Sequence, residues 1–239
     1  MSSEPGAPIG RRVFLGLLGL GAVGVVFGDA IQTAFSKIAN PVVQRDPTGV
    51  LGAALQVQGF RFYTVTDGYP SKSRTDYRLT VDGLVDQPYT LTYDELTALP
   101  PTMLTKDFQC VTGWRVPNVH WRGVLLSDLL DRAGLHSTGT ALRFYSFDGT
   151  YTESLTLDQA RRNDVIVAYE LGGNPLSREH GGPVRLYVAP MYGYKSCKWL
   201  ERIEVVDHVV PGYWEDEGYD VDAWVGRSNG RDDQPTSTS

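Results

Sequence analysis

Several common catalytic signatures are missing from this chain of 239 residues. It has no glycine-rich phosphate-binding loop of the G-x-x-x-x-G-K type, which leaves nucleotide-binding chemistry without local support. It also lacks H-E-x-x-H and C-x-x-C, and its four histidines, at positions 120, 136, 180 and 208, have no ligand spacing. We therefore do not expect a conventional zinc site.

Positive charge and cysteine are also scarce. The chain has 22 basic and 28 acidic residues, a net charge of −6, and only two cysteines. A nucleic-acid-binding protein should carry a basic face, so no nucleic-acid partner is expected. The apolar fraction of 41% is enough for a core without disulfides at this length, which suits one large domain or one domain plus a segment. Thirteen tyrosines and five tryptophans favour a β-rich fold or a pocket for a flat ligand.

The N-terminal residues look like a targeting signal. Arg11 and Arg12 precede sixteen uncharged residues, 13–28, which as a helix would span roughly 24 Å, short of a ~30 Å hydrocarbon core. The arginine pair resembles a twin-arginine export signal; the alternatives are a Sec signal or a short membrane anchor formed by residues 13–28. We expect residues 1–40 to be an export signal or an N-terminal membrane anchor with a spacer. The protein would then lie on the periplasmic or cell-surface side of the membrane.

The hydrophobic pattern predicts many strands and few, short helices. A capping box at Thr92 and Glu95 indicates a helix over 92–99, and Gly134 is placed to end a second helix over 127–134. Asp148-Gly149 predicts a hairpin turn within 141–155. Further strands are expected at 77–85, 102–110, 164–171, 181–190 and within 196–207, a helical turn at 157–163 and a turn at 172–176. This pattern indicates an α+β, β-rich mixed fold over residues 55–225, followed by a disordered tail at 226–239.

Cations and glycines gather in one segment of this acidic chain. Residues 178–199 contain Gly181, Gly182 and Gly193 together with five basic side chains: Arg178, His180, Arg185, Lys195 and Lys198. Glycine permits close backbone approach to a ligand, and arginine and lysine bind phosphate. Two interpretations stay open for this segment: an anion site for a phosphorylated cofactor, or a strand with solvated basic ends.

Three blocks carry a family resemblance. They are DFQCVTGW at 107–114, HWRGVLLSDLL at 120–130 and HGGPVRLYVAPMYGYKSCKWLERIEV at 180–205. Together they resemble the molybdopterin-binding domain of the sulfite oxidase family, which includes the periplasmic methionine-sulfoxide reductase catalytic subunit. The resemblance covers roughly residues 60–220. It implies a mixed α+β fold and a Mo-molybdopterin cofactor, with one molybdenum held by the pterin and one cysteine thiolate.

The resemblance also implies roles for individual residues. Cys110 matches the metal-binding cysteine, and a soft thiolate suits such a metal. The residues that match contacts to the pterin and its phosphate are His180, Arg185, Ser196, Cys197 and Lys198, and Tyr63 and Thr64 match a cofactor loop more weakly.

Two further positions bear on the substrate. Arg115 lies five residues after Cys110, where sulfite oxidases have a substrate arginine, although CVTGWR departs from the family pattern. Tyr219 matches the active-site tyrosine, whose hydroxyl could hydrogen-bond the reacting oxygen or relay a proton. The alternatives are a surface salt bridge for Arg115 and a packed core tyrosine for Tyr219.

We therefore expect a molybdenum-dependent oxidoreductase that transfers an oxygen atom on an S- or N-oxide or a related small substrate. No second redox centre is evident, so a partner such as a membrane cytochrome or a soluble carrier should exchange electrons with it. The chain ends soon after Tyr219, so neither the family's C-terminal immunoglobulin-like domain nor a dimer is expected. The alternative is an exported β-rich binding module without catalysis, stabilised by a Cys110–Cys197 disulfide; for Cys197 a buried free thiol is preferred.

Overall fold

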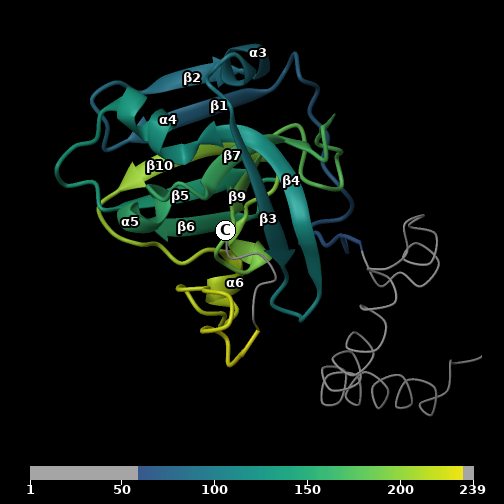
Figure 1. Ribbon diagram of the computed structural model, residues 1–239. Helices are drawn as coiled ribbons and strands as arrows, with labels where there is room; N and C mark the ends of the chain where they lie inside the picture. The colour runs from purple at the N-terminus through teal and green to yellow at the C-terminus, as the bar shows by residue number, and fades with distance from the viewer. Residues whose placement is uncertain (1–58, 234–239) are drawn as a thin grey trace, which may run out of the picture. The chain divides into compact units, whose positions relative to one another are not determined.

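Two five-stranded sheets organise the part of the chain that the computed structural model describes, residues 59–233 (Figure 1). The predicted export segment and the last six residues lie outside the described residues. Residues from Phe60 onward form one compact unit. The structure is rich in strands and has only short helices, so the predicted α+β fold is confirmed.

The first sheet pairs a strand from early in the described residues with one from late in them. Its strand order is β2 (Tyr89–Thr92), β1 (Arg78–Gly83), β10 (Leu200–Val206), β5 (Ala141–Ser146) and β6 (Thr152–Thr156). β1 and β10 are parallel, with Val81 opposite Ile203, and the other pairs are antiparallel. β5 and β6 form the hairpin predicted around Asp148-Gly149.

The second sheet is antiparallel and carries the site. β3 (Thr102–Gln109) pairs with β4 (Arg115–Leu125), and β4 pairs with β7 (Val165–Leu171). β8 (Asn174–Pro175) and β9 (Arg185–Val188) both pair with β7. In Figure 1, β3 and β4 form a long curved band along one side of the molecule.

The helices are short, and two of them begin at a threonine capping box. The helical elements are α3 (Tyr93–Thr97), α4 (Leu126–Ala133), α5 (Leu157–Ala160), α6 (Tyr213–Asp216) and the 3-10 turn η1 (Gly193–Lys195). The predicted capping box between Thr92 and Glu95 is present, and Gly134 ends α4 with a φ of 67°. Within the described range, no helix is long and apolar enough to cross a membrane.

The pattern missed the longest strand. β4 was not predicted, because Pro117, Asn118 and Gly123 interrupt it, and Asn118 has a φ of 52°. Alternation was nevertheless present, since Val119 and Trp121 are buried and their neighbours exposed. Gly123 is required here: a Cβ would lie 2.3 Å from the Val167 carbonyl oxygen of β7.

The C-terminal segment is more ordered than its composition predicted. The Asp233 carboxylate accepts hydrogen bonds from Gln109 at 3.3 Å and from the Tyr192 hydroxyl at 3.0 Å. The Asn229 amide donates to the Tyr194 hydroxyl at 3.1 Å. Residues 226–233, assigned above to a disordered tail, therefore pack on the domain, because polar side chains provide contacts that an apolar pattern does not reveal.

The core has two parts. The larger contains the inner faces of the first sheet, the apolar face of α4 and the fully buried Cys197. The smaller is aromatic and lies on the second sheet, where Trp121 stacks on Tyr187 with ring centroids 4.2 Å apart. Phe108 belongs to this aromatic cluster, and Cys110 packs against it. The residue predicted to bind the metal is thus supported by rigid rings.

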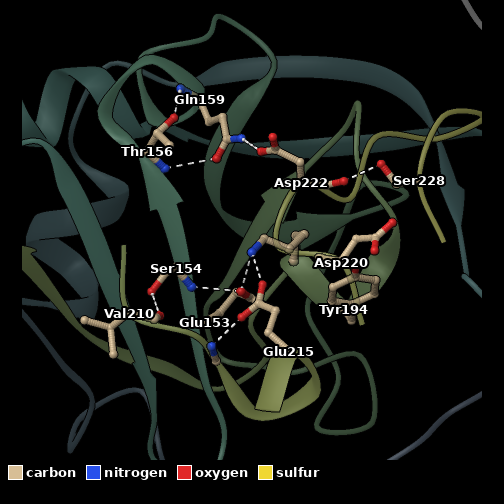
Figure 2. A network of polar contacts seen from close by, with 12 residues as sticks. Glu153, Ser154, Thr156, Gln159, Tyr194, Val210, Glu215, Asp220, Asp222 and Ser228 are labelled. Atoms are coloured by element: carbon tan, nitrogen blue, oxygen red, sulfur yellow. Dashed lines mark hydrogen bonds and ion pairs between the residues drawn. The ribbon is translucent and has the colours of Figure 1, made fainter. Parts of the chain in front are cut away.

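A buried ion network links three elements (Figure 2). The Lys195 ammonium of η1 contacts Glu153 of β6 at 2.5 Å and also Glu215 of α6, and all three side chains are at most 1% exposed. Two carboxyls share one ammonium, so the network is neutral only if one carboxyl is protonated. Burial raises the pKa of Glu153 well above its ordinary value; Lys195 opposes this rise and Glu215 adds to it.

We predict that Lys195→Met lowers the free energy of unfolding by about 3–5 kcal/mol, because it leaves two carboxyls buried without a cation. Glu153 has a raised folded pKa, so its contribution to stability is largest below 4.5 and falls as pH rises toward that folded value. Denaturant unfolding should therefore show that Lys195→Met lowers the free energy of unfolding more at pH 8 than at pH 5. The control Glu153→Gln should fold and flatten this pH dependence; an equally steep pH profile in that variant would contradict the assignment.

Candidate active site

A cavity of about 370 Å³ opens where the end of β3 meets segments from distant parts of the chain. Its wall includes residues 60–65, the turn after β3, the 148–151 hairpin loop, His180, Arg185, the loop after η1, and Trp214 and Tyr219. The predicted site residues that line it are Tyr63, Thr64, Cys110, His180, Arg185, Ser196, Lys198 and Tyr219. All eight lie more than fifty residues from at least one other member, so only the tertiary structure brings them together.

Cys110 is presented by a tight turn. The Gly113 N–H donates to the Cys110 carbonyl at 3.0 Å, and the Cys110 N–H donates to the Trp114 carbonyl at 2.9 Å. Gly113 has a φ of 100°, a left-handed conformation that favours glycine. The Thr112 hydroxyl donates to the Cys110 sulfur at 3.2 Å. The turn therefore exposes the thiol to the cavity and gives it a hydrogen-bond donor.

Arg185 is buried in the wall and holds the backbone of two cavity segments. Its Nη1 donates to the His180 carbonyl and its Nη2 to the Ser196 carbonyl, both at 2.8 Å. The Ser196 hydroxyl accepts from the Val188 N–H at 3.0 Å. Burial lowers the pKa of Arg185 to about 10, which leaves it charged at neutral pH. Arg185 thus acts on the site both as a fixed charge and as a brace.

Lys198 is the more adaptable cation. Its ammonium donates to the Tyr63 carbonyl and lies 4.3 Å from the centre of the Trp199 ring. Burial and then the charge of Arg185 lower the pKa of Lys198 to about 7. A bound anion would restore the charge, because opposite charges favour the ionised form. The residue beside Lys198 must be glycine, because a Cβ on Gly181 would lie only 2.6 Å from Lys198 Cβ.

His180 is held between two aromatic rings. The rings of Phe60 and Phe62 each lie 4.8 Å from its imidazole, edge to face, and the Ser177 hydroxyl is 2.9 Å from Nδ1. Burial and then Arg185 lower the pKa of His180 to about 4. The imidazole is therefore neutral at pH 7 and offers a hydrogen bond rather than a charge.

Tyr219 lies in an aromatic corner of the cavity. Its ring centroid is 5.5 Å from Tyr194 and 5.4 Å from Trp214. Its N–H donates to the Trp214 carbonyl at 3.0 Å, which holds the loop after α6. In the described part of the chain its hydroxyl has no hydrogen-bond partner, so the hydroxyl is available to a ligand.

Two predicted residues lie outside the cavity. Arg115 contacts the buried carboxylate of Asp107 at 3.7 Å and does not line the wall. Cys197 is fully buried in the larger core, where burial raises its pKa well above the ordinary value. The two cysteines are both free thiols, so the alternative with a Cys110–Cys197 disulfide is wrong. The physical reason is that the two side chains occupy different environments, one in the cavity wall and one in the core.

The structure adds residues that sequence reasoning missed. Asp148 lines the cavity, and its Oδ1 accepts from the N–H groups of Thr150 and Tyr151 at 2.9 and 2.8 Å. Its Oδ2 is buried and has no partner among the described residues, as is also true of Trp114 Nε1. Asp148 was recognised only as a turn residue, and no local signal could have revealed the orphaned oxygen.

The chemistry of these groups fits a molybdopterin. Across residues 59–233 no cluster of three or more His, Cys, Asp or Glu side chains is placed to hold a metal ion. Cys110 would supply the thiolate. Lys198 and Arg185 would face the phosphate, and Asp148 Oδ2 would accept from an amino group of the pterin. An anionic, flat, hydrogen-bonding ligand thus matches charges and orphaned atoms in this wall.

Comparison with known proteins gives the same answer. The family model described as "oxidoreductase molybdopterin binding domain" matches residues 67–214. The chain belongs to this family. A relative, the "uncharacterized oxidoreductase YuiH" of Bacillus subtilis, is 37% identical over 153 residues, which cover 63% of this chain and 76% of YuiH. The predicted oxidoreductase class and Mo-molybdopterin cofactor are therefore confirmed.

Other family members are longer. The methionine-sulfoxide reductase catalytic subunit MsrP of Ralstonia nicotianae is 30% identical over 154 residues, covering 58% of this chain and 46% of MsrP. The solved sulfane dehydrogenase SoxCD of Paracoccus pantotrophus matches with a TM-score of 0.56 and 29% identity, covering 60% of this chain and 41% of that chain. Sulfite oxidases also match. This chain thus spans less than half the length of several relatives that it resembles.

We predict that Cys110→Ser abolishes metal binding, because serine replaces the soft thiolate. The matched control is Cys197→Ala, which removes the other thiol from outside the cavity. After expression with the cofactor pathway intact, metal analysis should find about one molybdenum per chain in the wild type and the control, and near-background metal in Cys110→Ser. Equal molybdenum in both variants would refute the assignment of Cys110.

Proposed function

We propose that this protein is an extracytoplasmic molybdopterin oxidoreductase that reduces an uncharged S- or N-oxide. The observation that carries the proposal is the character of the cavity near Cys110. Trp114, Tyr194, Trp214 and Tyr219 form its walls there, whereas Arg115 is turned away toward Asp107. An aromatic wall without that arginine suits a neutral organic oxide better than a small dianion such as sulfite.

The reaction consumes two electrons and two protons per oxide, and releases the sulfide or amine and one water. The bound cofactor would supply the two-electron oxygen-atom chemistry. The chain's own residues bind and orient the substrate and exclude water. The aromatic walls hold the organic part of the substrate. The free hydroxyl of Tyr219 would donate a hydrogen bond to the oxide oxygen and assist its protonation.

We predict that the holoprotein reduces dimethyl sulfoxide or trimethylamine N-oxide with a reduced dye. Tyr219→Phe should lower kcat by about 100-fold with little change in KM, because the lost proton donor acts on the reacting oxygen. The control Tyr213→Phe alters a neighbouring tyrosine that stacks on Tyr151 but does not line the cavity. Faster oxidation of sulfite with a dye acceptor than reduction of either oxide would overturn the proposal.

The extracytoplasmic location is a separate part of the proposal and is supported by Arg11, Arg12 and the apolar residues 13–28. Twin-arginine export carries folded proteins, which suits an enzyme loaded with its cofactor before export. The double substitution Arg11→Lys/Arg12→Lys should leave the protein in the cytoplasm of a bacterial host, as measured by cell fractionation. Undiminished export of this variant, with a marker enzyme confirming intact cells, would argue against the twin-arginine route.

A further inference from the structure

The end of β3 faces two cavities. Phe108 and Cys110 line the active-site cavity, whereas Asp107 and Gln109 line a second cavity of about 330 Å³. Successive side chains of a strand point to opposite faces, which explains this division. The β3–β4 register shifts between Lys106 and Phe108, and Lys106 also lines the second cavity. The second cavity is therefore lined by Gln109, the residue directly before Cys110, on the opposite face of the strand.

Two cations of the second cavity have no counter-ion. Lys106 comes from β3 and Arg227 from the C-terminal segment, and neither side chain has an ion pair or hydrogen bond among the described residues. The third cation, Arg162, is already paired with Asp164 through two contacts of 2.8 and 2.9 Å, and lies 5.5 Å from the Trp224 ring centre. In a chain of net charge −6, this is a local positive site with room for carboxylates.

The floor of the cavity offers a hydrogen-bond acceptor. Gln109 is only 4% exposed, and its Oε1 has no partner within residues 59–233. Its Nε2 donates to Asp233 at 3.3 Å, which fixes the orientation of the amide. The Asp107 carboxylate is occupied, since it pairs with Arg115 and accepts from the Asn118 N–H at 3.0 Å. An entering peptide segment could therefore donate a backbone N–H to Gln109.

We propose that this second cavity docks an acidic segment of the electron-carrying partner protein. Carboxylates of the partner pair with Lys106 and Arg227, which places the carrier at a cavity lined by Gln109, the residue next to Cys110. The inference rests on the proposed function: each oxide reduced takes two electrons from the carrier, and a one-electron carrier docks twice. Because the two cavities share no lining residue, substrate and carrier can be bound together.

The first test measures docking directly. A fluorescently labelled hexaglutamate peptide should bind the holoprotein at low ionic strength, with affinity falling as salt is added. Lys106→Glu/Arg227→Glu should weaken binding about tenfold or more, because attraction becomes repulsion. The control Arg74→Glu reverses an exposed charge that lines neither cavity, and should leave affinity unchanged. No binding to the wild type, or equal loss in the control, would overturn the proposal.

The second test measures electron exchange without any oxide substrate. Reduced anthraquinone-2,6-disulfonate, an anionic dye, should transfer electrons to the double variant about tenfold more slowly than to the wild type. Electron transfer from a reduced cationic viologen should be equally fast in both proteins. Molybdenum content should be equal in all variants. Unchanged rates with the anionic dye would also count against docking. Failure of the proposed function would look different: peptide and dye effects would persist, but neither oxide would be turned over.

Discussion

The ion network of Lys195, Glu153 and Glu215 holds the site together. A lysine with no exposure to water must be paired, and both of its partners are equally buried. Because the three side chains come from η1, β6 and α6, each of these elements is fixed relative to the others (Figure 2). The loops beside them carry much of the cavity wall: Ser196 and Lys198 follow η1, and Tyr219 follows α6.

The end of strand β3 lines a different cavity with each of its faces. Cys110 lies on the aromatic side, where Phe108 and the rings around it exclude water and support the turn. The other side carries polar residues and the second cavity, where Gln109 is fixed by Asp233 from the C-terminal segment. Strand periodicity of two is the physical reason that adjacent residues face two separate cavities.

Local patterns predicted the elements whose signals are local. The capping box at Thr92 and the Asp148-Gly149 hairpin depend on residues that are close in sequence, and both are present. β4 was missed because Pro117 and Gly123 broke its pattern, although pairing with β3 and β7 stabilises the strand. The parallel pairing of β1 with β10 joins residues more than a hundred positions apart, which no local signal specifies.

For the site, sequence by itself determined the cofactor class. The blocks around Cys110 and from His180 to Lys198 carry that information in their residue types and spacing. Only the tertiary structure decided which side chains reach the cavity. It turned Arg115 toward Asp107, buried Cys197 in the core and left Asp148 Oδ2 without a partner among the described residues. Side-chain direction depends on strand register, turn geometry and the charges packed around it, and these are set by contacts between segments far apart in the chain.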